Sequence, residues 1–256
     1  MPALDGLCSR LPFFLFRIGF KTRGGSPPHF SFFLNQEISR FYPTRALLTP
    51  RSCVVPLDDA RACFETNLFG VISITQSFIP LLIASKGLII NIGSLASIVP
   101  YVFGSVYNAS KAALHAYSRT LRLELEPFDV RVMVVVTGGV QSNIARTHRI
   151  LPNDSLYLDI VGDFERRQTH SQEGAMGHDD YARGVVNAAL KKKPVKWLWR
   201  GNKAWLVWFV RAVSKLLEIS GLIEEFGRES LLTNDCSGWE LGSLTWLCRG
   251  CLGWIG

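Results

Sequence analysis

Four polar side chains in the middle of the chain have the types and spacing needed for proton transfer to a carbonyl group. Tyr107 and Lys111 are four residues apart in a helix-forming run, so both project from one face. A phenol can supply the substrate proton, and a neighbouring ammonium group favours phenolate and so lowers the phenol pKa. Ser94, which follows a short apolar run, could hold the substrate oxygen, and Asn67 could anchor a water for proton exchange.

The Tyr–Lys pair alone is a weak signal, because a packed tyrosine beside a solvated lysine has the same spacing. On spacing alone, that structural interpretation is favoured. The order of the neighbouring segments favours the catalytic interpretation instead. Along the chain these segments are Asn67, an apolar run ending at Ser94, residues 107–111, and an apolar run ending at Gly138. Ligand-binding residues collect at the carboxyl ends of strands in open parallel sheets, so this order favours a catalytic site.

The apolar pattern predicts the elements that position these side chains. Short apolar runs are typical of buried parallel strands, and they occupy residues 88–92, 130–136 and 196–199. Helical patterns cover residues 60–84, 105–126, 179–190 and 204–222, the last being amphipathic. A polar insertion fills residues 141–176. Strands that alternate with helices predict an α/β fold with a parallel sheet.

Five segments of this sequence resemble the short-chain dehydrogenase/reductase family. They are ETNLFG (65–70), IINIGS (89–94), YNASKAAL (107–114), LRLEL (121–125) and VRVMVVVTGGV (130–140). The resemblance implies a Rossmann-like, doubly wound parallel sheet. It also implies a catalytic tetrad of Asn67, Ser94, Tyr107 and Lys111.

The same resemblance implies a cofactor and a substrate. NADPH would be contacted by Asn67, Tyr107, Lys111, Val140 and Ser142, with Lys111 on the nicotinamide ribose. A small-molecule ketone would be reduced to an alcohol by hydride transfer, with Tyr107 as general acid. Within the family, TGGV, LPNDSLY and WRGNKAWLVWFV resemble the 1-acyldihydroxyacetone-phosphate reductase branch, which works at the endoplasmic reticulum and lipid droplets. Related reductases of secondary metabolism share the same core, so the carbonyl is either lipid-linked or a secondary metabolite.

One part of the family pattern is missing. The family's Gly-rich turn meets the cofactor pyrophosphate, and no two of the 22 glycines here lie at positions i and i+2. We therefore divide the chain into an irregular segment 1–55, a partial Rossmann domain 56–232 and an irregular tail 233–256. The hypothesis is a truncated or mis-spliced reductase. The alternative function is a non-catalytic remnant that binds no cofactor and associates with a membrane.

The charge and cysteine content narrow the classes of partner. Of the net charge of +7, +5 falls in residues 1–55, so the family-like part gives no reason to expect a nucleic-acid partner. The CxxC at Cys248 and Cys251 lacks a second pair, and we expect no metal site. We expect His115 to be a packed or surface residue of its helix. We expect the protein to be located in the cytoplasm or on the surface of the endoplasmic reticulum or a lipid droplet, and not to be secreted. The sequence is compatible with a homo-oligomer and does not decide the oligomeric state.

Overall fold

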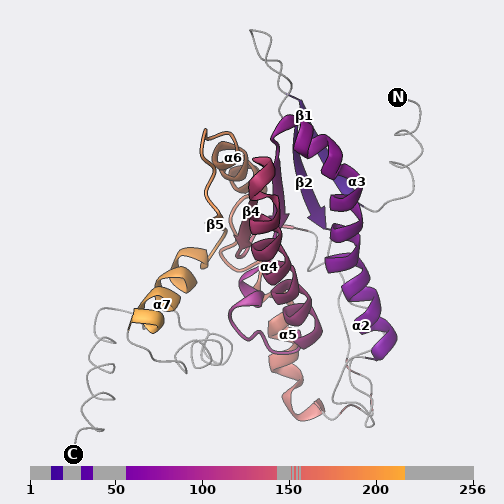
Figure 1. Ribbon diagram of the computed structural model, residues 1–256. Helices are drawn as coiled ribbons and strands as arrows, with labels where there is room; N and C mark the ends of the chain where they lie inside the picture. The colour runs from indigo at the N-terminus through magenta and orange to yellow at the C-terminus, as the bar shows by residue number, and fades with distance from the viewer. Residues whose placement is uncertain are drawn as a thin grey trace, which may run out of the picture.

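The computed structural model describes residues 13–19, 30–36, 56–142, 151, 153, 155 and 157–216. Its sheet has five strands in the spatial order β1-β2-β3-β4-β5 (Figure 1). They are β1 (Phe13–Gly19), β2 (Phe30–Gln36), β3 (Leu88–Ile92), β4 (Arg131–Thr137) and β5 (Trp197–Arg200). Strands β2 to β5 are mutually parallel, and β1 pairs with β2 in the antiparallel direction. The predicted α/β fold with a parallel sheet is confirmed.

Strands β1 and β2 depart from the expectation of an irregular segment over residues 1–55. Residues 31–34 of β2 pair with residues 88–91 of β3, so this segment extends the sheet beyond the three predicted strands. The composition explains why periodicity missed them. Both are seven-residue runs rich in phenylalanine, FFLFRIG and FSFFLNQ, which favours strands without a clean alternation.

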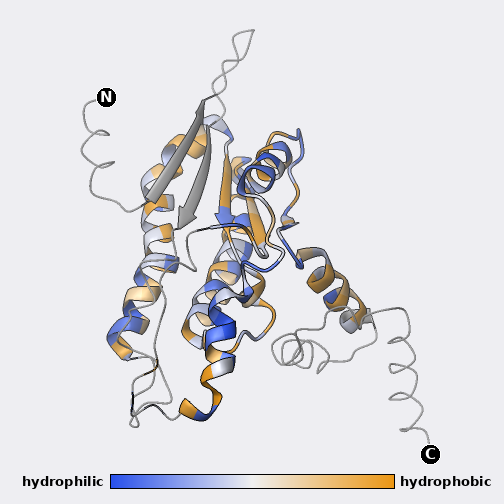
Figure 2. Cartoon of the chain, turned by 180° about the vertical axis from the view of Figure 1, so that it is seen from behind, coloured by the Kyte–Doolittle hydropathy of each residue, from blue (hydrophilic) through white to orange (hydrophobic). Residues whose placement is uncertain are grey.

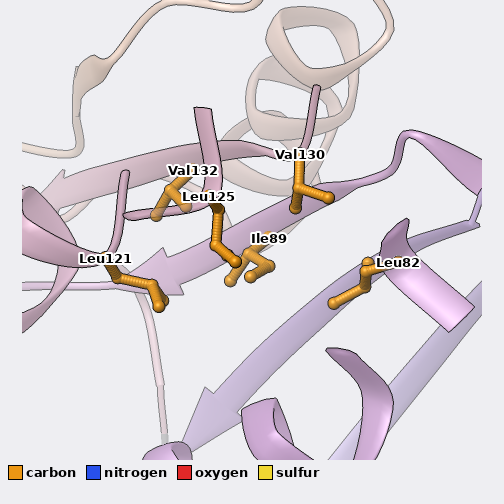
Figure 3. Close-up of a cluster of buried hydrophobic side chains, with 6 residues drawn as sticks. All are labelled: Leu82, Ile89, Leu121, Leu125, Val130 and Val132. Atoms are coloured by element: carbon orange, nitrogen blue, oxygen red, sulfur yellow. The ribbon is translucent and has the colours of Figure 1, made fainter. Parts of the chain in front are cut away.

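Helices α3 (Gly70–Ser85) and α4 (Ser105–Leu125) cover one face of the sheet. Figure 3 shows Leu82 of α3 and Leu121 and Leu125 of α4 directed at Ile89 of β3 and Val132 of β4. Val130, just before β4, completes this buried cluster. Because strand side chains alternate between faces, the remaining strand residues are left for the other side of the sheet.

Helix α6 (His178–Ala189) covers the opposite face. Its Val185 and Ala188 pack on buried strand residues, which are Leu88, Ile90, Met133 and Val135. Both faces of β3 and β4 are therefore covered, which explains their nearly continuous apolar sequences. The doubly wound arrangement inferred from the sequence resemblance is confirmed.

The helix over residues 57–85 consists of α2 (Leu57–Phe64), a π-helical segment η2 (Glu65–Phe69) and α3. The sequence predicted it as one regular helix over 60–84. By length and composition it could cross a membrane, a test that core helices also pass. A π segment is common at functional sites, and η2 carries the buried Asn67.

Two further helices lie at the carboxyl-end side of the sheet (Figure 1). Helix α5 (Val161–His170) lies within the predicted polar insertion and follows a short 3-10 turn, Leu158–Ile160. Helix α7 (Ala204–Leu216) follows β5, and its ribbon is mostly apolar in Figure 2. The predicted extension of α7 to residue 222, and most of the tail, lie outside the described residues.

Candidate active site

Ser94 and Tyr107 meet at the carboxyl end of β3. Ser94 caps the 3-10 turn η3 (Leu95–Ser97), and its Oγ accepts a hydrogen bond of 3.1 Å from the backbone N–H of Ala96. Its hydroxyl also hydrogen-bonds the Tyr107 hydroxyl. Tyr107 lies in the first turn of α4, so the contact joins the strand end to the helix that covers it.

The Tyr107 hydroxyl is a weaker acid here than in water. Burial raises its pKa to about 12, and the Ser94 hydrogen bond and the positive charge of Arg167 oppose that shift only partly. The net shift is opposite in direction to the lowering that we expected from Lys111, because desolvation of the phenolate outweighs the neighbours that lower the pKa. Tyr107 therefore stays protonated at neutral pH and is suited to donate a proton.

Lys111 is among the most deeply buried side chains of the chain, with 1% exposure. Its Nζ donates a hydrogen bond of 3.0 Å to the carbonyl oxygen of Ile92, and lies 6.0 Å from the Tyr107 ring centroid. Burial lowers its pKa to about 8. The one-turn spacing that the sequence predicted thus places an amine beside the phenol, under the end of β3.

Asn67 contacts α4 through Ser110. Its Nδ2 donates to Ser110 Oγ at 3.0 Å and to Cys63 Sγ at 3.4 Å, while Ser110 Oγ donates to the Tyr107 carbonyl at 2.8 Å. Both protons of the Asn67 amide are therefore used inside the protein, which leaves its carbonyl for the expected water. Sequence analysis missed Cys63 and Ser110, since buried polar partners carry no spacing signal.

Val140 and Ser142 lie on the segment that follows β4. Val140 bridges to Met176, and its carbonyl accepts from Gln172 Nε2 at 3.3 Å. The Ser142 backbone N–H donates to Gln172 Oε1 at 3.0 Å, and the residue is exposed. Gln172 therefore fixes this segment near the carboxyl end of β4. The contact of Val140 and Ser142 with a cofactor stays a prediction.

A second polar group that the sequence did not single out lies around Tyr101. We call Tyr101, Arg167, His170 and Lys203 the cationic cluster. The Tyr101 hydroxyl is 2.8 Å from His170 Nδ1, Lys203 Nζ is 3.3 Å from His170 Nε2, and the Arg167 guanidinium lies 3.3 Å from the Tyr101 ring centroid. These residues come from three separate segments, so only folding brings them together.

The charge of the cationic cluster is not neutralised by ion pairs. Among the described residues, the ion pairs join other side chains, such as Arg166 with Asp163, and none includes Arg167 or Lys203. The cluster is near the acid: Arg167 lowers, and Tyr101 raises, the pKa of Tyr107. Glu173 is the acidic residue that acts on Tyr101 and His170. The arrangement can therefore hold an anionic group beside a proton donor.

Comparison with known proteins agrees with this geometry. Residues 53–150 match the family model described as short chain dehydrogenase. The chain is 41% identical over 149 residues to the short-chain dehydrogenase srdE of Neurospora crassa, covering 57% of this chain and 51% of the relative. It is 40% identical over 168 residues to the NADPH-dependent 1-acyldihydroxyacetone phosphate reductase of Saccharomyces cerevisiae, covering 62% and 56%. The chain thus spans about half the length of these curated relatives.

A solved structure shows the same fold. The crystal structure of a short-chain dehydrogenase from Streptomyces avermitilis superposes with a TM-score of 0.52 at 20% sequence identity, covering 68% of this chain and 63% of the other. The fold, the sequence match and the meeting of Ser94, Tyr107 and Lys111 agree with one another. Over residues 53–150 the chain is therefore similar in sequence to the short-chain dehydrogenases, and its fold is similar to theirs.

Proposed function

We propose that this protein reduces a ketone to an alcohol with NADPH. The observation that carries the proposal is the hydrogen bond between the Ser94 and Tyr107 hydroxyls at the end of β3, with the buried Lys111 one turn along the same helix. A hydroxyl that holds an oxygen, beside a phenol that gives up a proton, is the donor set that carbonyl reduction needs.

Each side chain has a defined task in this reaction. Ser94 holds the substrate oxygen by a hydrogen bond, and Tyr107 donates its proton to that oxygen as negative charge develops there. The raised pKa of Tyr107 keeps the proton on the phenol until the substrate needs it. Lys111, with a pKa lowered to about 8, is still mostly charged at neutral pH and stabilises the phenolate left behind.

The donor set fits the nicotinamide half of the cofactor. Tyr107 and Lys111 share one face of α4 at the carboxyl ends of β3 and β4, where ligands bind in open α/β sheets. When bound there, NADPH would supply the hydride. Lys111 and Tyr107 would hold its ribose, and Val140 and Ser142 would lie beside the nicotinamide. The described residues include no Gly-rich turn for the pyrophosphate.

The cationic cluster supports a substrate that carries a negative charge. Arg167 and Lys203 reach it from α5 and from the turn before α7, and neither is paired with a described carboxylate. A phosphate or carboxylate group on the ketone would complete these contacts. The name of the yeast relative specifies a phosphate ester, so we infer a lipid-linked phosphate ketone as the first substrate to test.

A binding and turnover experiment with the full chain tests the proposal. We expect NADPH to quench tryptophan fluorescence with a micromolar dissociation constant, and more tightly than NADH. Oxidation of NADPH should then depend on an added ketone, with the Tyr107→Phe variant binding NADPH but turning over substrate at least about 10²-fold more slowly. Binding without ketone-dependent oxidation in the parent chain would contradict the proposed reaction.

The second candidate function is a non-catalytic protein at a membrane surface. It is favoured by α7, on which Trp205, Trp208 and Phe209 are exposed by 70%, 52% and 51% at one-turn spacing. Such a face suits the interfacial region of a bilayer. This candidate predicts no NADPH binding, together with co-sedimentation with phospholipid vesicles that the triple variant W205S/W208S/F209S loses. Vesicle binding alongside ketone reduction would instead indicate a reductase located at a membrane.

A further inference from the structure

Tyr101 lies on the loop before α4, and the reaction above gives its phenol no task. Phe103 of the same loop has a left-handed backbone, with φ 57°, which bulky side chains rarely adopt. Its ring packs edge-on against Phe164 of α5, with centroids 5.5 Å apart, and Phe164 is 2% exposed. This packing stabilises the strained turn and holds the loop against α5. Tyr101 is thereby placed against Arg167 and His170 of that helix.

The two partners of His170 assign the position of its ring proton. Tyr101 Oη is 2.8 Å from Nδ1, and Lys203 Nζ is 3.3 Å from Nε2. Burial lowers the pKa of His170, and the positive charge of Lys203 lowers it further, so the ring is neutral at physiological pH and has one N–H. An ammonium group donates hydrogen bonds and accepts none, so Nε2 is the acceptor and the proton is on Nδ1.

The direction of the hydrogen bond between Tyr101 and His170 follows from this tautomer. The two rings are tilted by 45° with centroids 5.9 Å apart, which is too far for the hydroxyl to lie over the imidazole face, so it meets Nδ1 at the ring edge. The Nδ1–H group therefore donates, and the phenol oxygen accepts. Burial raises the pKa of Tyr101, so the phenol keeps its own proton. Within the described part of the chain this hydroxyl bonds to His170 alone, and its O–H is left to donate to a ligand.

Arg167 offers further donors beside this hydroxyl. Its Cζ atom lies 3.3 Å from the centroid of the Tyr101 ring, and its Nε donates to the Val102 carbonyl at 3.1 Å. These contacts fix the guanidinium, whose terminal NH₂ groups make no hydrogen bond with a described residue. The guanidinium lies over the ring face, whereas the hydroxyl projects from the ring edge, so the donors do not share a plane. The tetrahedral oxygens of a phosphate group fit such a set better than the coplanar oxygens of a carboxylate.

We propose that Tyr101 is a substrate-binding residue, whose hydroxyl donates a hydrogen bond to the phosphate group of the substrate beside Arg167. His170 is the positioning residue that directs this hydroxyl, because its Nδ1–H occupies the phenol oxygen from the protein side. Tyr101 is close enough to Tyr107 to act on its pKa, so a ketone held by its phosphate group lies near the proton donor. The identity of the ligand as a substrate rests on the proposed function, whereas the binding of phosphate does not.

The first test measures phosphate binding by NMR and needs no turnover. Inorganic phosphate is titrated at constant ionic strength into the full chain labelled with 13Cζ-tyrosine, and the resonance lost in Tyr101→Phe reports the Tyr101 hydroxyl. We expect a saturable shift of this resonance and none for Tyr117, farther along α4. Arg167→Gln should weaken binding about tenfold, because a charge-assisted hydrogen bond is lost. Arg183→Gln, on α6, should not weaken it. The absence of a saturable shift, or an unchanged affinity in Arg167→Gln, would overturn the proposal.

The second test asks whether His170 directs the Tyr101 hydroxyl. Calorimetric titration with inorganic phosphate should show about tenfold weaker binding for Tyr101→Phe and for His170→Leu, because the first removes the donor and the second removes the group that directs it. The double variant should bind no more weakly than Tyr101→Phe, since both act through one hydroxyl. His170→Asn, which keeps a side-chain N–H near Nδ1, should recover most of the affinity. Multiplying losses, no recovery, or a 15N spectrum with His170 protonated at Nε2 would contradict the proposal.

Kinetics connect this site to the reaction. Tyr101→Phe should raise KM for a phosphorylated ketone about tenfold and leave kcat, and KM for a neutral ketone, nearly unchanged. An unchanged KM for the phosphorylated ketone would count against the proposal. If the parent chain shows no ketone-dependent oxidation of NADPH, the proposed function fails, and the phosphate titrations still decide whether Tyr101 binds the anion. If His170→Leu does not fold, as judged by circular dichroism, Tyr101→Phe and the 15N spectrum of the parent carry the second test.

Discussion

Two polar centres, each built around a tyrosine, lie close together and differ in how they treat charge. Around Tyr107, Lys111 is almost completely buried and its pKa is depressed to about 8. Around Tyr101, Arg167 and Lys203 are only partly buried and have no described carboxylate partner. Burial adjusts protonation in the first centre, whereas the second keeps its positive charge. The first is suited to chemistry and the second to holding an anion.

The two tyrosines give the sharpest test of this difference. Tyr107→Phe should lower kcat by roughly 10²–10⁴-fold, the usual range for loss of a general acid. Tyr101→Phe should leave kcat within about threefold, because this hydroxyl only contacts His170 in the described structure. Initial rates of NADPH oxidation over a range of ketone concentrations give both values. Equal losses in the two variants would remove the distinction between the centres.

The two lysines differ in their effect on stability. Between about pH 8 and the ordinary lysine pKa of 10.5, folded Lys111 has lost its proton while the unfolded chain still carries it. The unfolded state then binds more protons, so the free energy of unfolding of the parent should rise with pH relative to Lys111→Met. The rise should reach about 3 kcal/mol at most, since one pKa unit corresponds to about 1.4 kcal/mol.

Urea unfolding of the two proteins at several pH values measures this rise. Lys203→Met is the matched control. Because Lys203 is only partly buried, the curve of Lys203→Met should run parallel to that of the parent. A parent curve that also runs parallel to Lys111→Met would show that Lys111 is not buried as described.

Arg167 tests whether the cationic cluster selects the substrate. Arg167→Gln should raise KM about tenfold for a ketone with a phosphate or carboxylate group, because a charge-assisted hydrogen bond is lost. KM for a neutral ketone of similar size should stay unchanged. Arg183→Gln, on α6 and paired with Asp180, is the control. A phosphorylated and a carboxylated ketone compared side by side would show which anion the cluster prefers.

Substitution of His170 by asparagine should have the smallest effect of these changes on KM for the anionic ketone. Burial and the nearby Lys203 and Arg167 lower its pKa, so the ring stays neutral at physiological pH and adds no charge to the cluster. KM for the anionic ketone should therefore be nearly constant between about pH 6 and 8. His170→Asn should raise it by no more than about threefold. A KM that falls steeply below pH 7 would instead show that a protonated His170 binds the anion.

The sequence was sufficient for the elements and residues whose signals are local. The apolar runs of β3, β4 and β5 and the one-turn spacing of Tyr107 and Lys111 could be found by pattern alone. Strands β1 and β2 were not predicted, because their phenylalanine-rich sequences lack a regular alternation of apolar and polar residues. The π segment at Asn67 was not predicted, because its five residues lie within one continuous helix-forming run.

Tertiary structure alone decided which side chains meet and what that does to their charge. Ser110 joins Asn67 to α4 across 43 positions of sequence, and His170 contacts Tyr101 across 69 positions and Lys203 across 33. The sequence predicted that Lys111 would make Tyr107 more acidic, yet burial raises the pKa of Tyr107 and lowers that of Lys111. The reason is physical: spacing along a helix fixes which side chains are neighbours, whereas desolvation depends on every element packed around them.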